Sequence, residues 1–310
     1  MFYAVDAATG YIANYALRRK SDAVAVFRRC IVDLAHKAGT RIRCVRGDCD
    51  ALWTSKDFRD FCSTMGIAVQ HSPPGAQQYN GEVENAIQRC NEIAMASRRA
   101  AERRLGPWGF SCVRGLDARG DKLWAESAKD AAQKLNQAAS PSNPGRASPQ
   151  ELFTGRKGAF LVVPFFQYGF MYRERRSKLD DKAVPCYFLN AGDNHADCCE
   201  KVLSADTGRA CYASNATWAP LPQSGGGGVQ DCPSRVSTAH AAGGVIRDCL
   251  AAARRCHYPA CRRRLTAAHH CRYAVYHSHL AATTAAVVVE PPAALCELAQ
   301  RSRAAAARTY

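Results

Sequence analysis

The chain has 310 residues, enough for about two domains, and its 47% hydrophobic and 22% charged residues are typical of globular proteins. It has no run of about 18 apolar residues and no basic segment followed by an apolar one at its start, so we expect neither a membrane span nor a secretion signal. Lys and Arg number 42 against 27 Asp and Glu, a net charge of +15. This excess favours nucleic acid as the partner, the alternative being a cationic tail without a specific partner.

The composition changes near residue 220. Residues 219–310 contain 11 Arg, four acidic residues and no Lys, and they begin with the glycine-rich stretch Ser224–Gly228. This stretch is typical of a flexible linker, and we expect a poorly ordered tail of low complexity after it. Ten of the 16 cysteines lie before this point without regular spacing, so we expect reduced thiols rather than a disulfide scaffold.

The first part of the chain predicts an α/β fold. Phe2–Ala8 and Tyr11–Leu17 favour two strands joined at Thr9-Gly10. The elements expected next are a helix from Ser21 to Gly39, a strand at 42–45, a helix capped by Ser55 and ended by Gly66, a strand at 67–70, a loop at 72–81 and a long helix at 82–104.

Short apolar runs separated by turn residues predict a small barrel-like β module at 159–220. The expected division is therefore a core at 1–115, a helical connector at 116–158, the β module at 159–220, and the linker and tail at 221–310. In the tail, Cys256, Cys261, His269, His270 and Cys271 have zinc-ligand side chains, but only the first pair has a suitable spacing, so decaying or out-of-frame sequence is the favoured interpretation.

Two acidic residues lie at positions where catalytic side chains are commonly found in such an α/β topology. Asp48 follows a strand, and Glu84 lies in the first turn of the long helix, with 35 residues between them. Carboxylate oxygens are the ligands that Mg²⁺ prefers, and two such ions can promote phosphodiester cleavage. The alternatives are a turn residue for Asp48 and a helix-dipole partner for Glu84.

Four motifs follow one another in the first part of the chain: Arg46-Gly47-Asp48, Trp53-Thr54-Ser55-Lys56-Asp57-Phe58, Ser72-Pro73-Pro74 and Gln77-Gln78-Tyr79-Asn80-Gly81-Glu82-Val83-Glu84. In this order they resemble the integrase core of retroviruses and copia-type retrotransposons. Leu123-Trp124-Ala125-Glu126 and Ser148-Pro149-Gln150-Glu151-Leu152-Phe153 are similar to the segment that follows this core in copia-type polyproteins. The resemblance covers about residues 2–218.

This resemblance implies a ribonuclease H-like mixed sheet, two Mg²⁺ or Mn²⁺ ions, and processing and strand transfer of DNA ends. Asp48 matches the second acid of the family and Glu84 the third. The first acid lies on a strand before Phe2, which this sequence does not show, and Asp6 is expected to hold the Thr9-Gly10 turn instead. Cys49-Asp50-Ala51 also departs from the family's usual Asn-Gly-Gly.

The strand that bears the first acid is the central one of the family's sheet. Without it, two interior strand edges lose their hydrogen-bond partners, at a cost of about 1 to 3 kcal/mol for each buried group. The expectation is a truncated or decayed element that folds poorly alone.

The resemblance also places DNA contacts. Gln77, Gln78 and Asn80 lie in the loop before the long helix, and Gln88 follows Glu84 by one turn; polar loop filler is the alternative for the loop residues. Arg98 and Arg99 lie farther along the helix and are either phosphate contacts or a solvated helix end.

The favoured function is DNA integration by a retrotransposon polyprotein, and the alternative is a non-catalytic nucleic-acid-binding remnant or host-adopted fragment. The expected partners are element ends and target DNA, with a homo-oligomer if the chain is complete and no membrane. The expected location is the nucleus or a cytoplasmic particle.

Overall fold

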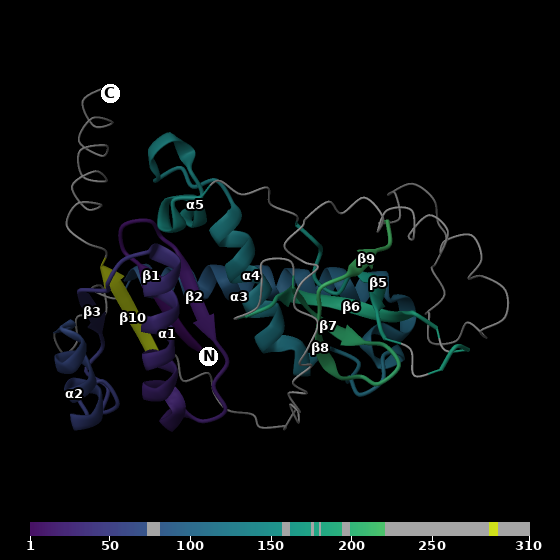
Figure 1. Ribbon diagram of the computed structural model, residues 1–310, viewed down its shortest axis with the longest axis horizontal. Helices are drawn as coiled ribbons and strands as arrows, with labels where there is room; N and C mark the ends of the chain where they lie inside the picture. Colours follow the sequence, from purple (N-terminus) through teal and green to yellow (C-terminus); the bar gives the residue numbers. More distant parts are fainter. Residues whose placement is uncertain are drawn as a thin grey trace. The chain divides into compact units, whose positions relative to one another are not determined.

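The computed structural model describes residues 1–72, 81–156, 162–174, 177–179, 181–193 and 199–220, and the backbone of 285–290. The described chain forms two compact units, each with its own sheet (Figure 1). The first contains residues 1–94, 128–162 and the strand at 285–290; the second contains residues 95–127 and 163–220. None of the described helices has the length and apolar character needed to cross a bilayer.

A hairpin opens the first unit, as the sequence predicts. Strand β1 (Phe2–Asp6) pairs antiparallel with β2 (Ile12–Tyr15), and every residue of both strands is buried. The turn between them is held by Asp6, whose carboxylate accepts hydrogen bonds from the Thr9 amide at 3.0 Å and the Thr9 hydroxyl at 2.6 Å. The expectation that Asp6 holds this turn is confirmed.

Alternating helices and strands follow. A short 3-10 helix (Lys20–Asp22) leads into α1 (Ala23–Ala38), and then come β3 (Cys44–Gly47), α2 (Lys56–Met65), β4 (Ala68–His71) and α3 (Gly81–Arg104). Gly39 and Gly66 end α1 and α2 in the left-handed conformation, as predicted. Ser21 is not the cap of α1: the helix begins one residue later, after Asp22. The Asp22 carboxylate accepts from the Arg19 amide at 3.1 Å, which fixes the preceding turn.

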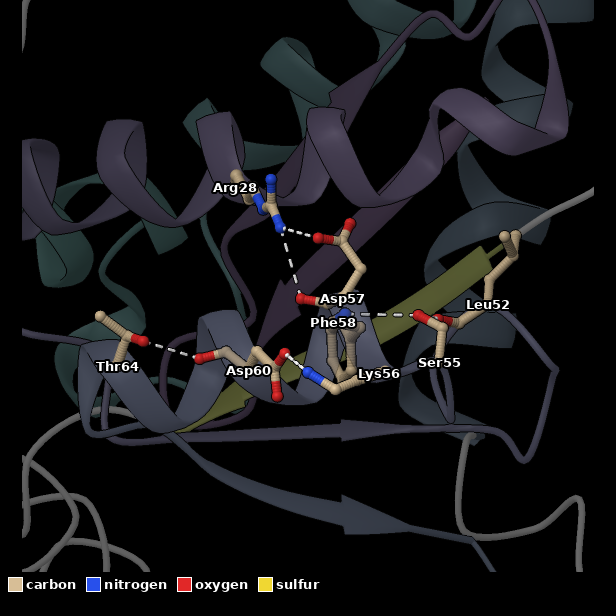
Figure 2. Close-up of polar contacts among 8 residues, drawn as sticks. All are labelled: Arg28, Leu52, Ser55, Lys56, Asp57, Phe58, Asp60 and Thr64. Atoms are coloured by element: carbon tan, nitrogen blue, oxygen red, sulfur yellow. Dashed lines mark hydrogen bonds and ion pairs between the residues drawn. The ribbon is translucent and has the colours of Figure 1, made fainter.

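The start of α2 shows how a few polar residues set a helix boundary (Figure 2). The Ser55 hydroxyl accepts a hydrogen bond from the Phe58 amide at 3.3 Å and donates one to the Leu52 carbonyl at 2.7 Å. Arg28 of α1 donates to the Asp57 carboxylate, joining the two helices. The cap proposed from the sequence is therefore confirmed, and the helix orients Phe58 toward the core.

The sheet of the first unit has the order β2-β1-β10-β3-β4, with β10 at Ala285–Glu290 (yellow in Figure 1). Strand β10 runs parallel to β1 and antiparallel to β3, while β3 and β4 are parallel. The sequence interpretation left this interior position empty and expected no strand in the tail. The structure corrects both points: Val287–Val289 have the high strand propensity of β-branched residues, and the strand that contains them fills the gap.

One aromatic core lies against this sheet. Phe27 of α1 packs among four rings, those of Phe2, Trp53, Phe58 and Phe61, at centroid distances of 4.9 to 6.4 Å. Strand β2 is an edge strand of this sheet, and a side chain of α4 (Trp124–Gln137) binds part of its free edge. Asn136 of α4 accepts from the Ile12 amide at 2.8 Å and donates to the Ile12 carbonyl at 2.7 Å. Its side chain thus replaces a strand neighbour.

Helix α5 (Pro149–Thr154) completes the first unit after a 3-10 turn at Pro144–Arg146. Ser148 and Glu151 form a capping box, in which the Ser148 hydroxyl accepts from the Glu151 amide and the Glu151 carboxylate accepts from the Ser148 amide. Phe153 stacks on Tyr11 at 4.4 Å between centroids. The Ser-Pro-x-Glu motif therefore has a structural role, which is to seat α5 against the hairpin.

The second unit contains 3-10 helices at Gly106–Cys112 and Asp121–Leu123 and an antiparallel sheet of order β8-β7-β6-β5-β9. The strands are β5 (Tyr168–Tyr172), β6 (Ala183–Ala191), β7 (Glu200–Ser204), β8 (Ala210–Ala213) and β9 (Ala216–Trp218). Across the described residues, no ladder joins β8 to β9, so the sheet is not a closed barrel, and the barrel-like character expected of this module stays a prediction.

The α/β class predicted from the sequence is confirmed. The nine described cysteines form no disulfide with one another. The expected boundaries at residues 115, 158 and 220 stay a prediction. The zinc-ligand candidates of the tail, from Cys256 to Cys271, lie outside the described residues.

Candidate active site

Asp48 lies at the carboxyl end of β3, beside the end of its parallel neighbour β4. Gly47 and His71 are paired across the two strands, and the His71 ring Nδ1 lies 3.3 Å from the Asp48 carbonyl oxygen. The Asp48 side chain is half-buried and accepts a long hydrogen bond, 3.4 Å, from the Asp50 amide. The strand therefore presents the Asp48 carboxylate at an accessible edge of the sheet.

The neighbours of Asp48 are engaged in local structure. Asp50 accepts from the Leu52 amide at 3.0 Å and pairs with Lys20 at 2.5 Å, and these contacts hold the pKa of Asp50 below its ordinary value. Cys49 donates from its thiol to the Ser72 carbonyl at 3.1 Å. Cys49-Asp50-Ala51 thus form a turn that fixes the chain after Asp48.

Glu84 lies in the first turn of α3, as predicted. Its helix buries Val83, Ala86 and Cys90, whereas Glu84 itself is exposed. A carboxylate in the first turn of a helix is stabilised by the helix dipole and can accept a cation there. Its predicted metal role therefore depends on which other oxygens come near it.

Within the described ranges, no group of three or more His, Cys, Asp or Glu side chains lies close enough together to hold a metal ion. Two Mg²⁺ or Mn²⁺ ions need several carboxylate oxygens, commonly including one that bridges the ions. The donor chemistry of Asp48 and Glu84 suits such ions, but the described residues do not supply the full set for two. The two-ion site stays a prediction.

Asp6 does not supply the missing carboxylate near Asp48. Through β10, Asp6 is level with Val45, three residues before Asp48 on β3. Two strand spacings and three residue rises separate the two acids, about 14 Å between Cα atoms. Burial raises the pKa of Asp6 to about 6, although the Thr9 hydrogen bonds oppose this shift, and the charge of Glu82 adds to it. Asp6 therefore belongs to the hairpin turn.

The sequence analysis did not predict which residue of the central strand lies beside Asp48. Tyr3 of β1 pairs with Ala286 of β10, and continuing the β10–β3 register by one residue brings Ala286 level with Asp48. The one acid of β10, Glu290, pairs instead with Cys44 at the start of β3. The valine run of the tail was the available signal for this strand, but its position in the sheet depends on pairing that spans most of the chain.

The predicted DNA contacts have different outcomes. Gln77, Gln78 and Asn80 lie outside the described residues. Gln88 is exposed and donates to Glu92 at 2.9 Å within α3, and Arg99 is exposed. Arg98 is about four-fifths buried and lies 3.9 Å from Asp121. The Arg98 side chain is thus mostly shielded from solvent, whereas the Arg99 side chain is accessible to a phosphate.

Other arginines of the same helix divide in the same way. Arg104 donates to the Phe165 carbonyl at 2.6 Å, and burial lowers its pKa. Arg103 is exposed. Arg99 and Arg103 are therefore exposed at this helix end, and the predicted contact of Arg98 and Arg99 with DNA stays a prediction.

No protein-family model matches the chain. It is 26% identical over 193 residues to a curated protein of Nicotiana tabacum, the retrovirus-related Pol polyprotein from transposon TNT 1-94; the match covers 61% of this chain and 13% of that polyprotein. The chain therefore corresponds to a small part of its relative's length.

Two solved structures are similar to this chain at lower sequence identity than the tobacco polyprotein. A chain of the simian T-cell lymphotropic virus intasome, solved in complex with PP2A regulatory subunit B56 gamma, is 15% identical with a TM-score of 0.35 over 71% of this chain and 72% of that chain. The catalytic core domain of BIV integrase is 16% identical with a TM-score of 0.34 over 49% of this chain and 92% of that chain.

Proposed function

We propose that the first part of this chain is the catalytic core region for DNA integration, because the chain is similar over 193 residues to the retrovirus-related Pol polyprotein of a tobacco transposon. The observation that carries the proposal is the placement of Asp48 at the carboxyl end of β3 and of Glu84 in the first turn of α3, with 35 residues between them. In this proposal both carboxylates bind Mg²⁺ or Mn²⁺, and a third carboxylate must come from another strand.

The partners in this proposal are element-end DNA and target DNA. In this proposal, exposed Arg99 and Arg103 contact phosphates without reading bases. The contacts to the DNA end are assigned to Gln77, Gln78, Asn80 and Gln88 from the sequence resemblance. A homo-oligomer and a location in the nucleus or a cytoplasmic particle complete the proposal.

Catalysis is tested by comparing the chain with a fusion that adds, before Met1, the residues preceding the aligned segment in the tobacco polyprotein, which should supply the strand and carboxylate of the proposal. We expect no DNA-end processing or strand transfer by the chain as given, because two carboxylates do not hold two ions. The fusion should restore both reactions, and Asp48→Asn or Glu84→Gln should then abolish them. Asp60→Asn, an exposed acid of α2, is the matched control. Activity of the unfused chain that Asp6→Asn removes would contradict the assignment.

A second function, non-catalytic nucleic-acid binding, is favoured by the alanine that lies level with Asp48. It predicts salt-sensitive DNA binding without activity in either the chain or the fusion. Each phosphate contact contributes about 0.9 to the slope of log K against log salt. Replacing Arg99 and Arg103 together by Ala should reduce this slope by about 1.8, and Lys56→Ala should leave it unchanged. A flat affinity between low and moderate salt would reject DNA binding.

A further inference from the structure

The interior position of the first unit's sheet is filled by a strand from far along the sequence. Five residues of β10 pair with β1 and four pair with β3. Over 200 residues separate β10 from β3 along the chain. The sequence continues with Pro291-Pro292, which lack amide hydrogens and therefore cannot donate to a ladder. The strand thus has a defined end and two hydrogen-bonded edges.

The flanking strands share a core in addition to their link through β10. Phe2 and Ala4 of β1 and Val45 of β3 belong to the same core cluster, and the Phe2 and Trp53 rings lie 6.0 Å apart. These side-chain contacts connect the two sides of the gap independently of the β10 ladder. The unpaired amides and carbonyls along β1 and β3 would then make a binding site for extended backbone.

Such a site accepts a strand in either direction, because amides and carbonyls alternate along both edges of any strand. The direction of β10 is parallel to β1. A strand joined to β1 by a short turn would instead run antiparallel to it and parallel to β3. It would also close a much shorter loop, which costs less chain entropy than bringing β10 back from the far end of the sequence.

We propose that the gap between β1 and β3 is a strand-acceptor site, and that Ala285–Glu290 of the same chain is its resident, replaceable occupant. The site selects an apolar, β-branched segment through the buried surfaces of its neighbours. A further consequence, which rests on the proposed function, is that β10 completes the sheet without bringing an acid level with Asp48. The resident strand then keeps the metal site incomplete until another strand displaces it.

A disulfide reports occupancy directly. Glu290 and Cys44 are opposite each other in an antiparallel pair, where Cα atoms lie about 4.5 to 5.5 Å apart, within the range that a disulfide bridges. In the full chain, Glu290→Cys should form a 44–290 disulfide under mild oxidation, located by mass spectrometry in the monomer band. Cys44→Ser should abolish it, and Val289→Cys, whose partner Val45 has no thiol, should not form the corresponding link.

The outcomes separate the occupants of the site. A 44–290 link found only in dimers would show that a second copy supplies the strand, and absence of the link while both thiols react in urea would show that β10 does not occupy the gap. Either result overturns the proposal.

Amide exchange tests the contribution of β10 to the sheet. Val288→Pro should speed exchange in β1 and β3 at least tenfold while leaving β5–β9 unchanged; Ala282→Pro, upstream of the strand in the same tail, should leave both unchanged. Unaltered exchange in Val288→Pro would contradict the proposal. If Val288→Pro does not fold, the disulfide decides alone.

Displacement is tested in the active fusion carrying Glu290→Cys. Oxidation should lock β10 in place and abolish strand transfer, and reduction should restore it, whereas the fusion without the added cysteine should be unaffected. Strand transfer that persists in the locked fusion would reject displacement. A fusion that forms the link but is inactive in both states would reject the proposed function and leave the acceptor site standing.

Discussion

The two sheets of this protein are assembled from strands at very different separations in the sequence. In the second unit, β5 to β9 follow one another between Tyr168 and Trp218. In the first unit, β10 provides the hydrogen-bonded link between the hairpin and the β3–β4 pair among the described strands. Contacts between neighbours form with little loss of chain entropy, whereas remote pairing must close a long loop first. The first sheet is therefore the part whose integrity depends on the whole chain.

The largest expected difference between the units comes from the aromatic core. Phe27→Ala removes the ring that contacts Phe2, Trp53 and Phe58, and should lower the unfolding free energy of the first unit by about 3 to 5 kcal/mol. Hydrogen exchange should show this loss in β1–β4 and not in β5–β9. Val32→Ala, an exposed position on the same helix, should cost less than about 1 kcal/mol. Equal loss in both sheets would mean that the two units unfold together.

A second substitution should destabilise the second unit instead of the first. Gly208 has a φ of +64°, and a Cβ there would lie 2.2 Å from the Arg114 carbonyl oxygen. Gly208→Ala should therefore cost about 2 to 4 kcal/mol, from left-handed strain and from displacement of the backbone. Gly115→Ala is the matched control, because its Cβ would meet the Gly208 carbonyl oxygen at 3.8 Å, an ordinary contact. Calorimetry of the two variants separates the clash from the strain.

The pH dependence should also distinguish the units. Burial raises the pKa of Asp6 and of Asp130 from 3.8 to about 6, and both lie in the first unit. Their folded forms bind protons more tightly than the unfolded chain between pH 4 and 6, so these groups make the first unit more stable as the pH falls from 7 to 4. The contribution is about 2 to 3 kcal/mol for each group.

Asp6→Asn should remove its share of this slope, while Asp60→Asn, at an exposed position, should not change it. Denaturant melts followed by exchange in β1 and β2 between pH 7 and 4 provide the measurement. A slope that Asp6→Asn leaves intact would show that Asp6 is ionised in the folded chain throughout this range.

The smallest expected loss of stability comes from removing the N-terminal cap of α2. Ser55→Ala removes the acceptor of the Phe58 amide and should cost about 1 kcal/mol (Figure 2). Lys56→Ala removes an exposed i,i+4 pair with Asp60 and should cost a few tenths of a kcal/mol. Thermal melts of the two variants should therefore differ, and equal midpoints would indicate that the cap adds nothing beyond a surface ion pair.

Sequence reasoning succeeded where the signal is local. The Thr9-Gly10 turn, the Ser55 cap and the Gly39 and Gly66 helix ends each depend on residues within a few positions, and the structure has all of them. It failed at β10, because the position of Val287 between β1 and β3 is set by a gap elsewhere in the chain.

The candidate site divides in the same way. Asp48 and Glu84 were placed correctly on their elements, since a strand end and a helix start can be read from neighbouring residues. Which side chains surround them is a property of strand order. Sequence spacing does not show that Ala286 lies level with Asp48. It also does not show that Arg98 is largely buried near Asp121.

The side chain of Asn136, bound to both backbone groups of Ile12, has a consequence for self-association. A sheet with two open edges can add copies at each side and grow into a fibre, but here the β2 edge is blocked and β4 forms the other end of the strand order. Two copies joined edge to edge through β4 would leave only blocked edges outward. If copies associate through this sheet, we expect assembly to stop at a pair, and Asn136→Ala should allow further growth.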